Sequence, residues 1–164
     1  MVTHAPVDAA TFREAMARFA SGVTVVTTRD AAGTPVAFTA TAFSSLSLDP
    51  PLILVCLDTR ASCYPAFQAA PHFAVSILAA GQAEHALRFA ARGTDKFAGV
   101  TVQPGPVTAL PLLPRALVHL ECRTHRRFEA GDHTIIVGEV VRAESRDAMP
   151  LVHFNRRFGA FVPQ

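Results

Sequence analysis

The sequence predicts a mainly β domain, in which strands form a barrel or sandwich with two or three short helices between them. Segments rich in β-branched residues recur at short spacing and are separated by Gly, Pro and Asp turn signals. The helical segments do not alternate regularly with these strands, which disfavours a doubly wound parallel sheet. Of the 164 residues, 50% are hydrophobic and 17% charged. This composition argues against disorder and suits one folded domain over residues 1–164.

A helix of about three turns is predicted near the N-terminus, with Asp8 as its N-cap and an end at 21–22. Its apolar positions at helical spacing are Phe12, Ala15, Met16 and Phe19.

A β-hairpin is expected next. The β-branched run 23–28 precedes a turn signal at 30–34, and a partner strand is expected over 35–43. The segment 44–51 is expected to be a loop. The aliphatic run 52–57 predicts a strand buried on both sides.

Short helices and strands alternate through the rest of the chain. We expect helices at 61–70 and 81–91, the second with Ala86, Leu87 and Ala90 as its apolar stripe. A loop over 93–114 is expected to contain only a brief strand at 100–102. The predicted strands cover 72–78, 116–128, 133–143 and 151–162, with a turn at 129–132.

Charge and hydropathy exclude several partners. The formal net charge is +2, and there is no run of like charges, so nucleic acid and an anionic membrane are not expected to bind. The longest aliphatic run, 52–57, is far shorter than the roughly 18 residues of a transmembrane helix. The N-terminus lacks a signal-peptide pattern, and three cysteines in no CxxC arrangement suit a reducing compartment. We therefore expect a cytoplasmic protein.

Common catalytic motifs are missing. The chain has no P-loop, no Rossmann glycine pattern and no nucleophile elbow. His119, Cys122 and His125 do not suit a metal site, because strand geometry puts Cys122 on the opposite face from the two histidines. Cys122 is instead expected to be a core thiol on the same face as Val118 and Leu120, and no metal is predicted.

Several polar segments admit both a binding and a structural interpretation. The hydroxyl-rich segment 39–47 could contact a polar ligand, although its composition alone favours a plain loop. Arg60 and Ser62 could hold a phosphate at a helix start, or Ser62 could be a simple cap. His133 follows a Gly-Asp turn, where it could contact a ligand or only complete the turn.

Ordered blocks over nearly the whole chain resemble the short-chain flavin reductases, the reductase components of two-component flavin-dependent monooxygenases. These blocks are FREA at 12–15, FASGVTVVTT at 19–28, TATAFSSLSLDPPL at 39–52, FAVSIL at 73–78, GQ at 81–82, LEC at 120–122, GDHTI at 131–135 and VGEV at 137–140.

The resemblance implies an FMN-binding split β-barrel that forms a homodimer, with flavin sites near the subunit interface. It further implies NAD(P)H:flavin oxidoreductase activity, with FMN or FAD as the flavin and NADH, or alternatively NADPH, as the co-substrate. Reduced flavin would then leave for a partner monooxygenase. In such an enzyme the protein mainly holds two rings in contact, because the cofactors bring the chemistry.

The resemblance also implies roles for individual residues. His133 would lie beside the nicotinamide as the one catalytic residue. Flavin ring and ribityl contacts are implied for Thr39, Ala40, Thr41, Ala42, Ser44, Ser45, Cys56, Leu57 and Asp58. Phosphate contacts are implied for Arg60 and Ser62, and contacts to the phosphate or adenylate end for Phe89, Ala90, Arg92 and Lys96. Further nicotinamide nucleotide contacts are implied for His153, Asn155, Arg156 and Phe158.

Two other functions remain open at this point. A flavin-binding carrier or sensor module would share the fold, because a fold does not determine a function. An oxidase of the pyridoxamine phosphate type would need a strongly basic phosphate cluster, and the chain has a single lysine, Lys96.

Overall fold

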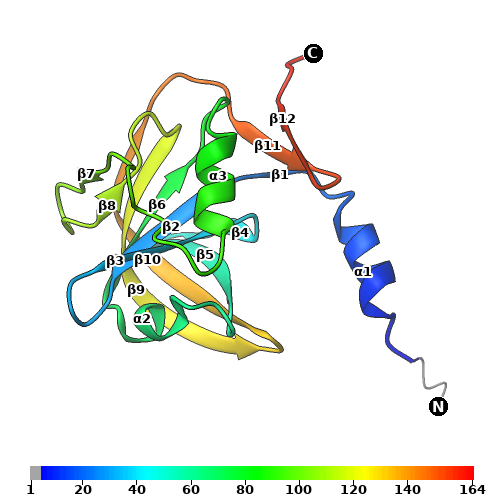
Figure 1. Cartoon of the computed structure of the whole chain (residues 1–164), viewed down its shortest axis with the longest axis horizontal. Coiled ribbons are helices and arrows are strands. Elements are labelled where there is room, and N and C mark those ends of the chain that lie inside the picture. Colours follow the sequence, from blue (N-terminus) through cyan, green and yellow to red (C-terminus); the bar gives the residue numbers. More distant parts are fainter. Residues whose placement is uncertain (1–4) are drawn as a thin grey trace.

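The computed structural model describes residues 5–164. It begins with helix α1 (Ala9–Met16), which stands clear of the main body (Figure 1). The predicted N-cap is confirmed, because the Asp8 carboxylate accepts hydrogen bonds from the amides of Ala10 and Thr11. None of the residues of α1 is buried, so its apolar side chains face outward. The helix is shorter than the three turns predicted.

A seven-stranded antiparallel sheet forms the main body, which confirms the mainly β prediction. Its strand order is β3-β2-β6-β9-β10-β5-β4. The edge strands β3 and β4 are linked directly by residues 41–42, so the sheet curls until its edges approach each other (Figure 1). The strands are β2 (Thr24–Arg29), β3 (Pro35–Ala40), β4 (Phe43–Leu48), β5 (Pro51–Asp58), β6 (His72–Ile77), β9 (Val118–Ala130) and β10 (His133–Ser145).

The predicted hairpin at 23–43 is confirmed in its turn and in the pairing of its two strands, β2 and β3. Asp30 builds the turn, because its carboxylate accepts hydrogen bonds from the amides of Ala32 and Thr34. Gly33 adopts φ +82°, which a side chain would disfavour. The partner strand ends at Ala40, however, and the expected loop at 44–51 is wrong, because most of it pairs with β5 as strand β4.

Two small sheets complete the strand set. Strand β1 (Ser21–Gly22) pairs with β11 (Leu151–Phe154), which pairs with β12 (Arg157–Ala160). The single strand predicted over 151–162 is therefore wrong, because Asn155 and Arg156 form a turn with positive φ between two strands. Strands β7 (Gln103–Pro104) and β8 (Pro111–Leu112) pair with each other, and the strand expected at 100–102 is absent.

Two short helices cover the sheet. Helix α2 (Tyr64–Ala69) is shorter than predicted, and α3 (Ala83–Ala90) packs over β2 and β3. The predicted stripe of α3 is only partly correct, because Ala86 is buried whereas Leu87 is 62% exposed. Phe89, one turn from Ala86, is the second residue that α3 buries.

The core lies inside the curled sheet. Phe38 and Phe67 meet there edge to face, with ring centroids 4.9 Å apart. Strand β5 buries only alternate side chains, so the expected burial on both faces is wrong. Cys122 is fully buried, as predicted. Packing is tight at Gly138, where an added Cβ would lie 2.3 Å from the Phe73 ring.

A buried carboxylate ties the β7–β8 loop to the sheet. Glu121 is fully buried on β9 and accepts hydrogen bonds from the amides of Val107 and Thr108 and from the Thr108 hydroxyl. These bonds satisfy the buried carboxyl oxygens. Glu121 therefore holds the segment that closes one face of the sheet.

In residues 5–164, none of the helices is both long enough and apolar enough to span a bilayer. The same residues contain no cluster of three His, Cys, Asp or Glu side chains suited to a metal ion.

Candidate functional site

A cavity of about 220 Å³ opens between β5, the end of α3 and the start of β10. Of the residues expected in a site, it gathers Thr39, Cys56, Leu57, Asp58, Ser62, Phe89, Ala90, Arg92, Lys96 and His133. Its wall also includes Phe38, Ala61 and Ala91, which no sequence pattern indicated. These three residues are apolar and belong to no recognisable sequence motif. Only the curvature of the sheet shows that they line the cavity. We call this space the central cavity.

The hydroxyl-rich segment contributes less than expected. Ala40 is buried, whereas Thr41, Ala42, Ser44 and Ser45 are exposed and do not line the central cavity. The Ala42 carbonyl nevertheless accepts a hydrogen bond from the Cys56 amide, so the 41–42 link runs beside the cavity wall. Thr39 does line the cavity, but its hydroxyl donates to the Ala86 carbonyl at 2.7 Å and ties β3 to α3.

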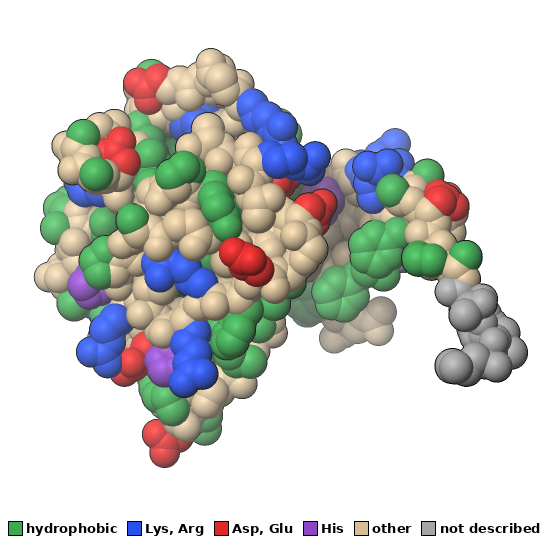
Figure 2. All heavy atoms as spheres, turned by 90° about the horizontal axis from the view of Figure 1, so that it is seen from below, with side chains coloured by type: hydrophobic (Ala, Val, Ile, Leu, Met, Phe, Trp, Pro, Cys, Tyr) green, Lys and Arg blue, Asp and Glu red, His purple; other side chains and the backbone are tan. Residues whose placement is uncertain are grey.

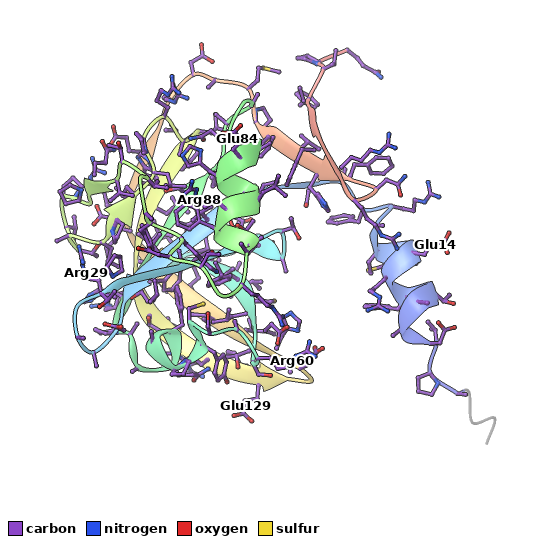
Figure 3. The ribbon with its side chains drawn as sticks, viewed as in Figure 1. Glu14, Arg29, Arg60, Glu84, Arg88 and Glu129 are labelled. Carbon is purple, nitrogen blue, oxygen red and sulfur yellow. The ribbon has the colours of Figure 1, made fainter. Side chains whose placement is uncertain are left out.

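The expected C-terminal residues lie elsewhere in this chain. His153 and Phe158 face each other on the β11–β12 hairpin, with ring centroids 5.5 Å apart. Asn155 and Arg156 line a separate polar cavity against α1, together with Glu14. Figure 3 shows Glu14 on α1 far from Arg60, which lies near the central cavity. Within one chain, the hairpin therefore does not reach that cavity.

The mouth of the central cavity is positively charged. The Asp58 carboxylate accepts two hydrogen bonds from the Arg60 guanidinium, and Arg92 lies 3.6 Å from the same carboxylate. The side-chain and backbone hydrogen bonds from Arg60 lower the pKa of Asp58 to about 2. Asp58 is therefore ionised at neutral pH and orients two arginines, which leaves a net positive charge.

Lys96 adds a half-buried cation. Its Nζ donates to the backbone carbonyls of Ala37 and Phe89, at 3.0 and 2.8 Å. Desolvation lowers the pKa of this ammonium. No carboxylate pairs with Lys96 among the described residues. An ammonium has three donors, so one remains for an anionic ligand.

His133 is oriented by the turn that precedes it. Its Nδ1 lies 2.7 Å from Asp132 Oδ1, and a carboxylate can only accept, so Nδ1 carries the proton and Nε2 is left for a ligand. The same hydrogen bond lowers the pKa of Asp132. Thr59 holds the Asp132 carbonyl through its amide and its hydroxyl, at 3.0 and 3.1 Å. The turn is thus attached to the segment that carries Asp58 and Arg60.

Ser62 lines the cavity and does not cap the following helix. The N-cap position of α2 is Cys63, which makes no side-chain capping bond. The helix-cap interpretation of Ser62 is therefore wrong, and its place in the cavity wall favours ligand binding.

Comparisons with known proteins agree with this geometry. Residues 16–161 match the family model described as "Flavin reductase like domain". The reductase component of the 4-nitrophenol 4-monooxygenase/4-nitrocatechol 2-monooxygenase of Rhodococcus opacus is 43% identical over 161 residues, covering 96% of this chain and 84% of its own. The NADH:riboflavin 5'-phosphate oxidoreductase of Streptomyces pristinaespiralis is 44% identical over 154 residues, covering 93% of this chain and 88% of its own.

A solved structure extends the similarity to three dimensions. The NADH:FAD oxidoreductase of Streptomyces globisporus C-1027, solved in complex with NAD and FAD fragments, superposes with a TM-score of 0.90. It is 39% identical to this chain, and the match covers 95% of this chain and 94% of that one.

Proposed function

Because the chain belongs to the family of flavin reductase-like domains, we propose that it is an NAD(P)H:flavin oxidoreductase that reduces FMN or FAD and releases the reduced flavin. Relatives named as NADH-dependent reductases of both FMN and FAD favour turnover over the alternative of a flavin-binding carrier or sensor. We interpret the curled sheet as the split β-barrel of a single domain.

One observation carries this proposal: a single cavity joins a cationic end to an oriented imidazole. Arg92, Lys96 and Ser62 suit the phosphate of a flavin, because guanidinium, ammonium and hydroxyl groups all donate hydrogen bonds. Lys96 is half-buried without a carboxylate partner among the described residues, so an anion beside it would be favourable. The apolar wall beside them suits a flat ring.

The proposed chemistry needs little from the protein besides position. A flavin held in this cavity would supply the hydride acceptor for a dihydronicotinamide ring, so the redox chemistry would come from the cofactors. Phe38 and Leu57 are buried in the cavity wall and would exclude water, and Lys96 and Arg92 would hold the phosphate end. His133 Nε2 would face the nicotinamide ring. Holding two rings in contact in this way supplies most of the rate increase.

The direct test is an anaerobic assay of the purified protein with NADH or NADPH and added FMN, FAD or riboflavin. We expect rapid loss of the visible absorbance of flavin present in large excess over the protein, because reduced flavin leaves after each turnover. Bleaching of only one equivalent of flavin would instead indicate a carrier or sensor, and no bleaching would overturn the reductase assignment.

We propose a monooxygenase as the acceptor of the reduced flavin. Relatives named as reductase components of monooxygenases support this, among them the Rhodococcus opacus protein. A cytoplasmic location would suit the three cysteines, which are free thiols.

We also propose that two copies of the chain form a homodimer through the exposed apolar side chains of α1, of the segment that follows it, and of β4. Phe19 is 76% and Leu48 91% exposed, and Phe12 and Met16 of α1 are more than half exposed. Figure 2 shows hydrophobic side chains gathered on the projecting helix. An isolated helix of eight residues is marginal in water, so α1 needs a surface that covers it.

Light scattering coupled to size-exclusion chromatography tests the dimer. We expect twice the 17.5 kDa of one chain for the wild type. Replacing Phe19 with glutamate is expected to shift the protein towards the monomer, since a charge would be buried at the interface. Replacing the exposed Val107, on the β7–β8 loop, with glutamate is the matched control and should leave the dimer intact. A monomeric wild type would contradict the proposal.

A further inference from the structure

The turn that precedes His133 is exposed and is tied to the rest of the protein at one point. Residues 129–132 join β9 to β10 and are all exposed, and Gly131 adopts φ +65° there. Among the described residues, the hydrogen bonds that reach this turn from outside the β9–β10 hairpin both come from Thr59. Its amide and its hydroxyl donate to the Asp132 carbonyl. Thr59 therefore fixes the place from which the imidazole of His133 starts.

Thr59 acts from outside the ligand sites. It is exposed, and it lines neither the central cavity nor the polar cavity against α1. A loss of its hydroxyl would therefore remove no direct contact to a ligand in either cavity. Any effect on ligand binding would have to pass through the Asp132 carbonyl.

Thr59 belongs to a short segment, 58–62, that Asp58 organises. The Asp58 carboxylate accepts hydrogen bonds from the amide and the guanidinium of Arg60, and its carbonyl accepts one from the Ala61 amide. Asp58 is also the register partner of His133 across β5 and β10. Figure 3 shows Arg60 and Glu129 at the same end of the molecule. One end of the segment thus lies against the turn that positions His133.

The other end of the segment meets the place proposed for the flavin phosphate. Ser62 lines the central cavity, and Ser62 and Lys96 also line an adjoining cavity of about 300 Å³, so an anion has room beside them. Arg60 uses Nε and Nη2 on Asp58, and its side chain is 70% exposed, so donors remain for an anion at the mouth. A bound phosphate would restrict this exposed guanidinium and, with it, the segment.

We propose that Thr59 is a positioning residue that couples the two ligands: a flavin phosphate steadies segment 58–62, and Thr59 transmits this order to His133, so that NADH binds more tightly. The inference rests on the proposed flavin reductase function and adds a cooperativity to it. A first ligand that orders a shared segment removes part of the ordering cost for the second. Because such coupling is reciprocal, NADH should strengthen phosphate binding by the same factor.

A comparison of FMN with riboflavin isolates this coupling from direct contact between the two rings. Both flavins bring the same ring to the nicotinamide, but only FMN brings the phosphate that steadies the segment. We expect the KM for NADH in the wild type to be about fivefold lower at saturating FMN than at saturating riboflavin, the lower end of couplings between sites. The measurement is anaerobic steady-state kinetics with each acceptor.

Thr59→Val removes the hydroxyl and retains the amide bond to Asp132. We expect the KM for NADH with FMN to rise about threefold, as for the loss of one exposed hydrogen bond, with kcat unchanged. The KM with riboflavin should stay nearly the same, so the difference between the two acceptors should fall below about twofold. Thr59→Ser restores a hydroxyl and should restore the difference.

Thr124→Val is the matched control. The Thr124 hydroxyl also ties β9 to a distant backbone carbonyl, that of Ala70 at 2.9 Å, and Thr124 lines neither the central cavity nor the polar cavity. The same substitution there should leave the KM for NADH unchanged with both flavins.

Three results would overturn the coupling. The first is an equal KM for NADH with FMN and riboflavin in the wild type. The second is an equal rise of both KM values in Thr59→Val, because Thr59 would then only brace the turn. The third is a fall in kcat with an unchanged KM. A wild type that reduces no flavin would instead refute the proposed function itself.

Inorganic phosphate tests the coupling on the wild type alone, which keeps the proposal testable if Thr59→Val does not fold. With riboflavin as the acceptor and the ionic strength held constant with chloride, phosphate should lower the KM for NADH towards the value for FMN. With FMN as the acceptor, the position is already filled and phosphate should have no effect. A KM with riboflavin that phosphate leaves unchanged or raises would contradict the proposal.

Discussion

Replacing Lys96 with methionine is expected to weaken FMN and FAD binding by about 10- to 100-fold. Methionine preserves the length of the side chain and removes its charge. A hydrogen bond between charged groups contributes about 1.5–3 kcal/mol, and Lys96 is the half-buried cation at the proposed phosphate position. Flavin fluorescence titration of the wild type and the variant measures the change.

Riboflavin separates this effect from a structural one, because it lacks the phosphate. We expect Lys96→Met to leave the Kd of riboflavin nearly unchanged. Lys96→Arg retains the positive charge and should recover part of the FMN affinity. If riboflavin and FMN lose affinity equally, the role of Lys96 is to brace the carbonyls of Ala37 and Phe89 rather than to bind a phosphate.

Replacing His133 with alanine is expected to raise the KM for NADH by up to about tenfold with nearly unchanged flavin affinity. The loss corresponds to one hydrogen bond to an imidazole whose turn Asp132 and Thr59 hold in place. Steady-state kinetics at saturating FMN give the KM, and titration with FMN gives the affinity.

A second histidine provides the control. His125 is exposed on β9 and lines none of the cavities described above, so His125→Ala should change neither constant. Equal losses of NADH and flavin affinity in His133→Ala would contradict the nicotinamide role, because they would show that His133 supports the cavity as a whole.

Local signals in the sequence predicted elements whose stabilising groups lie within a few residues. The Asp8 cap and the Asp30 turn each depend on a carboxylate that bonds to amides two to four residues away. The alternation along β9 placed Cys122 in the core, because strand geometry assigns faces by position. The strand pattern of the sequence predicted the mainly β fold, and the family resemblance implied several cavity residues, among them Asp58 and His133.

Contacts between segments far apart in the chain determined the features that the sequence did not predict. Nothing within 44–51 indicates a strand, and β4 exists because β5 offers it hydrogen-bonding partners. Phe89 rather than Leu87 faces inward because α3 lies on β2 and β3. Ser44 and Ser45 do not line the cavity that their composition suggested, whereas Lys96 lines two cavities. Sequence order specifies which groups are available, but only the curled sheet brings residues 34–39, 56–62, 89–97 and 133 together. The contacts that create the site join segments far apart in the chain, and no local pattern encodes them.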